Sequence, residues 1–154
     1  MKYAAIILAL VLVAALTITG ITLFTSSITV SAAKQGITAR AAAEDPELFA
    51  QVAEAARSTY PIREDDIGSY TFYTWRVEIS NNSYVPLEMV EATIHTQPGD
   101  IARIGQTAET AVAAHTTGSI TITMLCRTAA SPARDITVSW YLWGEKHMET
   151  VTVQ

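Results

Sequence analysis

Cysteine is almost absent from this chain of 154 residues, which has only Cys126, so no disulfide can form within the molecule. A folded domain must therefore be stabilised by its hydrophobic core alone. Basic side chains are also few, since 10 Lys and Arg stand against 15 Asp and Glu and give a formal net charge of −5. Without a basic patch the chain lacks the charge that attracts a phosphate backbone, so we do not expect nucleic acid as a partner.

The sequence also lacks the motifs of common catalytic and metal sites. Its three histidines have no metal-ligand spacing: His95, His115 and His147. Ser31 and Lys34 match an S-x-x-K motif without the S-D-N and K-T-G partners, so we interpret the match as chance. The acidic residues 64–66 lack the ligand spacing of a calcium loop and are interpreted as a solvated turn. We therefore predict no enzymatic activity, with no catalytic residues, metal or cofactor.

A long apolar run is the first feature that the sequence does contain. Residues 3–24 carry no charge, and a helix of this length covers the roughly 30 Å hydrocarbon core of a bilayer. We predict a transmembrane anchor over 1–24, with the alternative of a signal peptide cleaved at about residue 33, where small residues follow Val30. Because Lys2 precedes the run, the positive-inside rule predicts a single-pass membrane protein with a cytoplasmic N-terminus and an extracytoplasmic C-terminal domain.

The rest of the chain divides into two parts. Residues 25–66 are predicted to form a stalk, rich in Ser, Thr and Ala over 25–44, with a short amphipathic helix over 46–57 that begins at Asp45-Pro46. From residue 67 to 154 apolar and polar side chains alternate in about seven short segments separated by turn residues. This pattern is typical of an antiparallel sandwich and not of a parallel α/β sheet.

The aromatic residues of this second part indicate both a core and a surface. Trp75, Cys126 and Trp140 alternate in phase with the apolar residues of their strands, so we expect them in the core. Trp143 falls with Tyr141 on the opposite face of the strand that holds Trp140. Trp143 and Tyr141 are therefore the candidate residues of an interaction surface.

Turn residues in the middle of the chain follow a defined order: Asn81-Asn82-Ser83, then Pro86-Leu87, then Gly99 and Ile101-Ala102 before Gly105. With them, the segment 75–127 resembles the late-embryogenesis-abundant type 2 family, which includes the water-stress-and-hypersensitive-response proteins. The resemblance implies an immunoglobulin-like or fibronectin-like sandwich, often behind one N-terminal membrane span and without enzymatic activity. The predicted fold class is thus mainly β: a seven-stranded antiparallel sandwich of this kind, preceded by a transmembrane helix and a short amphipathic helix.

These expectations together favour a non-enzymatic, membrane-anchored extracytoplasmic β-sandwich that acts as an interaction or envelope-structural module. Its expected partners are a lipid bilayer, contacted through residues 3–24, and an unidentified protein or a second copy of the chain. Two alternatives stay open. One is a pilin-like filament subunit that assembles through its apolar N-terminal helix, and the other is a secreted binding protein left after signal cleavage.

Overall fold

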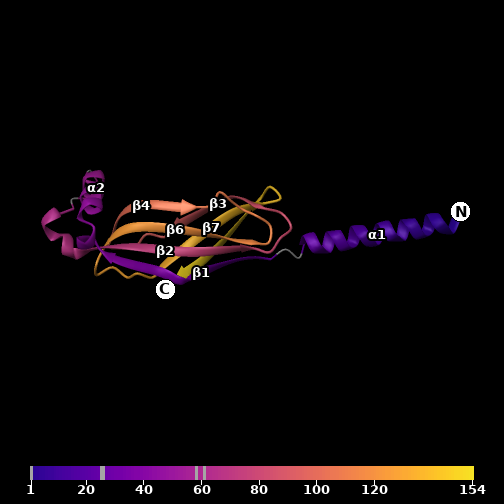
Figure 1. The fold of residues 1–154 in the computed structure, drawn as a ribbon, viewed down its shortest axis with the longest axis horizontal. Helices are drawn as coiled ribbons and strands as arrows, with labels where there is room; N and C mark the ends of the chain where they lie inside the picture. Colours follow the sequence, from indigo (N-terminus) through magenta and orange to yellow (C-terminus); the bar gives the residue numbers. More distant parts are fainter. Residues whose placement is uncertain (1, 25–26, 58, 61) are drawn as a thin grey trace.

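The protein consists mainly of β-strands, and its N-terminal helix lies apart from them (Figure 1). The computed structural model describes residues 2–24, 27–57, 59–60 and 62–154. The helices in these residues are α1 (Lys2–Phe24) and α2 (Pro46–Ala56), with the 3₁₀ helices η1 (Ala42–Glu44) and η2 (Glu64–Ser69). The strands are β1 (Ile28–Ala41), β2 (Tyr70–Asn81), β3 (Leu87–Ile94), β4 (Asp100–Ala108), β5 (Ala111–Val112), β6 (Thr116–Arg127), β7 (Arg134–Leu142) and β8 (Glu145–Val153).

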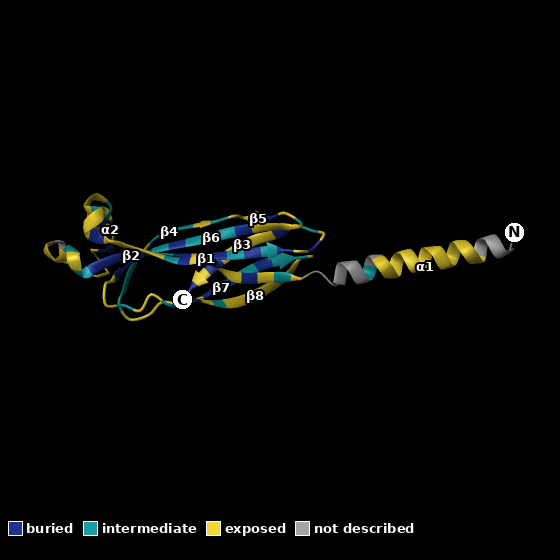
Figure 2. Cartoon of the chain, turned by 60° about the horizontal axis from the view of Figure 1, so that its bottom comes forward, coloured by how far each residue is buried: buried dark blue, intermediate teal, exposed yellow. Residues whose placement is uncertain are grey.

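The strands form two sheets of four strands each. One sheet has the order β1-β2-β6-β4 and the other has the order β5-β3-β7-β8. Because successive side chains of a strand face opposite sides, every second residue of β2, β6 and β7 points between the sheets and leaves water. The resulting core contains Trp75, Ile79, Ile122, Cys126 and Trp140, and Figure 2 shows these strands striped with buried residues. The predicted core positions of Trp75, Cys126 and Trp140 are confirmed.

The predicted fold class is wrong in its strand count, since the described residues form eight strands in two sheets of four and not seven strands. The additional strand is β1, which lies in the segment expected as a stalk. β1 pairs with β2 and shifts register between Ala32 and Ile37. Its residues are mostly Ala, Ser and Thr with few large apolar side chains, so its alternation is too weak to distinguish a strand from a loop.

The bulge in β1 brings its backbone against the last strand, β8. A Cβ atom on Gly36 would lie 2.8 Å from Cγ1 of Val153, so only glycine fits this close approach. Val153 is itself fully buried. The first and last strands therefore close one side of the core together.

The predicted membrane topology is also wrong. The anchor was expected in α1, whose side chains are described from Ile6 to Ile18 and at Gly20. Among the described residues, no helix has the length and apolarity that crossing a bilayer core of about 30 Å requires. The prediction of a transmembrane helix before the sandwich is therefore wrong. The single-pass localisation with a cytoplasmic N-terminus, which depended on that helix, is wrong with it.

Helix α2 begins at the cap that the sequence predicts and packs on the sandwich. Oδ1 of Asp45 accepts a hydrogen bond from the backbone N–H of Leu48 at 3.1 Å, and Pro46 occupies the first turn. The apolar side of α2 then contributes to a second hydrophobic cluster, separate from the main core: Phe49 and Val52 with Tyr70, Phe72 and Leu125. This cluster holds α2 against β2 and β6.

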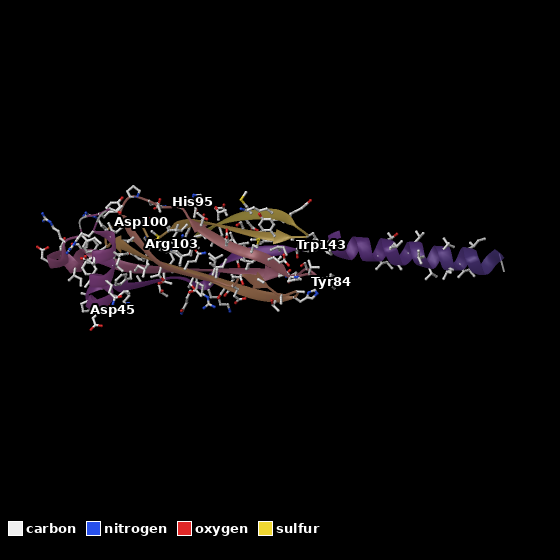
Figure 3. The ribbon with its side chains drawn as sticks, turned by 90° about the horizontal axis from the view of Figure 1, so that it is seen from above. Asp45, Tyr84, His95, Asp100, Arg103 and Trp143 are labelled. Carbon is white, nitrogen blue, oxygen red and sulfur yellow. The ribbon has the colours of Figure 1, made fainter. Side chains whose placement is uncertain are left out.

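The two ends of the sandwich differ in how they are covered. The end that we call the α2 end holds α2, η1, η2 and two connections between the sheets, 95–99 and 128–133. The opposite end, which we call the loop end, faces α1 in Figure 1 and holds the connections 82–86, 113–115 and 143–144. In Figure 3, Asp45 and Asp100 lie toward the α2 end, whereas Tyr84 and Trp143 lie at the loop end.

Candidate functional site

A buried ion pair lies at the α2 end. Arg134, the first residue of β7, is 0% exposed and pairs with Asp100, the first residue of β4. The guanidinium carbon also lies 5.4 Å from the ring centroid of Trp75. Its Nη1 donates to three further oxygens: the Gln97 side chain at 3.1 Å, the Ala133 carbonyl at 2.9 Å and the Ser131 carbonyl.

The carboxylate of Asp100 completes this buried cluster. Oδ2 accepts a hydrogen bond from the backbone N–H of Gln97 at 2.8 Å, and Oδ1 accepts one from the Cys126 thiol at 3.3 Å. Trp75 Nε1 donates to the Pro132 carbonyl at 2.7 Å. The cluster therefore fastens the β3–β4 and β6–β7 connections to strands β2 and β6.

Cys126 is the one nucleophilic side chain in this cluster. Burial, followed by the hydrogen bond to Asp100, raises the pKa of its thiol from 9.0 to about 12. The thiolate is the reactive form of cysteine, and a thiol with so high a pKa stays protonated at neutral pH. The chemistry of the cluster is therefore that of a structural anchor and not that of a nucleophilic site.

The three histidines are held by different neighbours. His95 Nε2 lies 2.9 Å from Oγ1 of Thr137, His115 lies beside Tyr84, and His147 stacks on Trp140. Within the described ranges, no group of three or more His, Cys, Asp or Glu side chains could hold a metal ion. In the acidic segment 64–66, Asp66 accepts a hydrogen bond from Ser69, and the side chain of Glu64 lies outside the described part.

Two open hollows flank α2. The larger, of about 440 Å³, is lined by residues of β1, α2, β2 and β6: Thr38, Ala39, Arg40, Leu48, Phe72, Thr74 and Thr123. The cation in this lining, Arg40, forms a salt bridge with Asp45, with 2.7 Å between Nη2 and Oδ2. The smaller, of about 300 Å³, lies between α2 and β4 and has an alkyl lining interrupted by Gln51 and Arg103. Neither lining brings a base beside a nucleophile.

Trp143, a predicted interaction residue, lies at the loop end but not on the expected strand face. It forms the two-residue turn between β7 and β8 with Gly144, and both have positive φ, +57° and +78°. Such a turn matches the twist of the two strands but is unusual for a bulky residue. Trp143 is 62% exposed. Tyr141, the other predicted residue, pairs with Lys146 across β8 and is half-buried.

Two further large apolar side chains at the loop end are exposed, and the sequence pattern did not indicate them. Tyr84 is 61% exposed and meets the ring of His115 edge-on, with 4.9 Å between centroids. Met89 is 64% exposed and lies in the irregular part of β3. Like Trp143, Met89 and His115 have positive φ angles, of +50° and +56°. Nothing in the local residue types signals this backbone conformation.

Asn81 positions the loops that carry these side chains. It is 0% exposed, and its Nδ2 donates to carbonyls of two loop-end segments: Val85 at 2.8 Å, Val112 at 3.0 Å and Ala113 at 3.0 Å. Its Oδ1 accepts from the backbone N–H of Ser83 at 3.0 Å and from the Ser83 hydroxyl at 2.6 Å. One buried amide therefore joins the backbone of the Tyr84 loop to that of the His115 loop, and the two rings contact each other edge-on.

No family model and no curated protein matches this chain. The resemblance of residues 75–127 to the late-embryogenesis-abundant type 2 family therefore stays a prediction. The candidate site rests on the geometry of the loop end.

The buried ion pair predicts a large loss of stability in Arg134→Met. The substitution leaves Asp100 buried without its partner, so the free energy of unfolding is expected to fall by about 3–5 kcal/mol. Arg40→Met, which removes a partly exposed pair with Asp45, is the control and is expected to cost at most about 1 kcal/mol. Urea unfolding followed by tryptophan fluorescence measures both. Equal losses in the two variants would contradict the role assigned to Arg134.

The pKa of Cys126 predicts a protected thiol. In native protein at pH 8 a thiol reagent is expected to leave Cys126 unmodified, whereas chain unfolded in urea reacts fully, because only the unfolded thiol is both accessible and partly ionised. Raising the pH from 8 to 10 should accelerate the unfolded reaction but not the native one. A Lys34→Cys variant, which adds an exposed thiol, is the positive control. Rapid native modification of Cys126 would show that the cluster is open.

Proposed function

We propose that this chain is a non-enzymatic binding module that docks a partner protein at its loop end. The observation that carries the proposal is the set of exposed large side chains on preorganised loops: Tyr84, Met89 and Trp143. Trp and Tyr are the side chains most often found to dominate protein–protein binding energy. They offer a large contact area with few rotatable bonds, so little conformational entropy is lost when they bind.

The backbone of the loop end supports this role. A non-glycine residue with positive φ costs about 1–3 kcal/mol, and such strain concentrates at binding and catalytic sites. Three such residues, Met89, His115 and Trp143, belong to the loop end and its adjoining strand. Because Asn81 already fixes two of the loops, binding does not have to order them, which favours affinity.

The charges around the exposed side chains define the partner further. Three exposed carboxylates surround the loop end: Glu88, Glu109 and Glu145. Lys146 is an exposed cation near them. A complementary partner surface therefore has an apolar depression that accepts Trp143, with Lys or Arg side chains at its rim.

A second candidate function is assembly of several copies through α1. The large apolar side chains from Ile6 to Leu16 are 55–67% exposed on all sides of the helix. A helix that is apolar all round is stable in water only when another surface covers it. A filament core of packed α1 helices, as in the pilin-like alternative, would provide that surface, and electron microscopy of sheared material tests it.

Two other expectations stay predictions. One is the contact of residues 3–24 with a lipid bilayer, and the other is the secreted alternative.

Substitutions at the loop end are expected to abolish partner binding. A photo-crosslinking amino acid at position 143 should capture a discrete protein in the organism that makes this chain. The same probe at Tyr60, an exposed tyrosine between α2 and η2 at the α2 end, should not capture it. Trp143→Ala should then weaken binding of the captured partner at least about 30-fold, equivalent to ~2 kcal/mol, while Tyr60→Ala leaves it unchanged. Equal capture from both positions, or full affinity of Trp143→Ala, overturns the proposal.

A further inference from the structure

Strand β8 is an edge strand whose first part is uncovered. Within the described residues it pairs only with β7. Its last residue, Val153, is buried against β1, but every residue from Glu145 to Thr150 is exposed, and Met148 is 69% exposed. A strand edge of this kind presents free backbone N–H and C=O groups that can pair with another strand.

The side chains of this segment lie on two faces. His147 and Glu149 stand opposite Trp140 and Val138 of β7, whose side chains belong to the core, so they lie on the inner face. His147 stacks on the Trp140 ring with 6.1 Å between centroids and 17° between planes. Both are nevertheless exposed. Lys146, Met148 and Thr150 alternate with them on the outer face.

We propose that β8 pairs with β8 of a second copy of this chain, antiparallel and centred on Met148. Two identical antiparallel strands are related by a two-fold axis perpendicular to the sheet, which keeps each side chain on the same face. Odd-numbered residues therefore face odd-numbered residues of the other copy, and even-numbered residues face even-numbered ones. In this register Met148 faces Met148 of the partner copy, and each Lys146 faces a Thr150. Each His147 faces a Glu149, which places two unlike polar pairs on the inner face.

Charge selects this register over its two neighbours. Centring the pair on His147 would place Glu145 directly opposite Glu149 twice. Centring it on Glu149 would place that carboxylate opposite its own copy. Like charges directly opposite in a sheet are destabilising, whereas unlike pairs stabilise it. The Met148-centred register alone among the three has no facing carboxylates. It also brings two exposed Met148 side chains together on the outer face, where each shields part of the other from water.

This dimer extends the proposed function without depending on it. Because β8 runs from the loop end toward the α2 end, antiparallel pairing directs the two loop ends away from each other. The facing segment Glu145–Val151 contains neither Tyr84 nor Trp143, so the dimer presents two loop ends. Glu145 and Lys146 border both surfaces, but the exposed side chains Tyr84, Met89 and Trp143 belong to the loop end alone, so each proposal can fail without the other.

A disulfide trap tests the register directly. Cys126 is buried, so Met148→Cys supplies the accessible thiol, and the facing Cα atoms in this register lie about 4.5–5.5 Å apart, within disulfide range. Lys146→Cys is the matched control, because its two copies are offset by four residues, about 13 Å. Mild oxidation of the full chain is expected to give at least about tenfold more cross-linked dimer from Met148→Cys than from Lys146→Cys. Equal yields, or no cross-link from Met148→Cys, overturn the proposal.

Charge reversal in the Met148→Cys background tests the polar pairs. Glu149→Lys places a second basic side chain opposite His147 and is expected to lower the cross-link yield about tenfold. Adding His147→Glu restores an unlike pair in both positions and is expected to restore the yield. Urea unfolding of each variant confirms that it is folded. A folded Glu149→Lys variant with undiminished yield, or a folded double variant without recovery, contradicts this register.

Discussion

The buried pair between Arg134 and Asp100 is the constraint on which the α2 end depends. Removing two charges from water costs more than their attraction returns unless hydrogen bonds satisfy the other polar atoms. Here the guanidinium has a side-chain amide, two carbonyls and the face of Trp75 around it, and the carboxylate has a backbone N–H and a thiol. Among the described residues, Nε of Arg134 has no hydrogen-bond partner. All these partners are in place only when the β3–β4 and β6–β7 connections adopt this conformation. Since both connections cross between the sheets, the pair fixes how one sheet lies on the other.

Asn81 provides the corresponding interaction at the loop end with a neutral group. Its side-chain amide joins the β2–β3 and β5–β6 connections. Each end of the sandwich is thus fastened by one fully buried polar side chain. Asn81 bonds mostly to backbone atoms, whereas Arg134 bonds to two carbonyls and two side chains. The two ends differ in what surrounds these anchors. At the α2 end the 3₁₀ helices and α2 add a second apolar cluster, whereas the loop end keeps Tyr84, Met89 and Trp143 exposed. This difference is why we place partner binding at the loop end.

Sequence patterns predicted the features that depend on neighbours along the chain. Alternation in β2, β6 and β7 placed Trp75, Cys126 and Trp140 in the core, and Asp45-Pro46 marked the start of α2. β1 was missed because Ala, Ser and Thr do not produce a clear alternation, and its strand character comes from pairing with β2. The transmembrane prediction used the length and the apolarity of residues 3–24, and no described helix is long and apolar enough to cross a membrane.

The features that depend on distant residues were not predictable in this way. The sequence pattern did not indicate Arg134 as a buried residue, because an arginine is rarely buried and its partner Asp100 lies 34 positions away. Trp143 was expected to be exposed because it would lie on the outer face of a strand. In the structure it lies instead in the turn between β7 and β8. Tyr84 and Met89 gave no signal, since their exposure follows from how Asn81 and the β3 irregularity arrange the chain.

Native-state hydrogen exchange tests most directly whether the Arg134–Asp100 pair locks the α2 end. Two backbone amides report on the locked connections: Arg127, which donates to the Gly99 carbonyl at 2.8 Å, and His95, which donates to the Asp135 carbonyl at 2.9 Å. If the lock holds, these amides exchange only when the whole sandwich unfolds, with the same opening free energy as the central residues of β2 and β6. Exchange of both amides by a local opening of much lower free energy, while the central strands stay protected, would contradict this account.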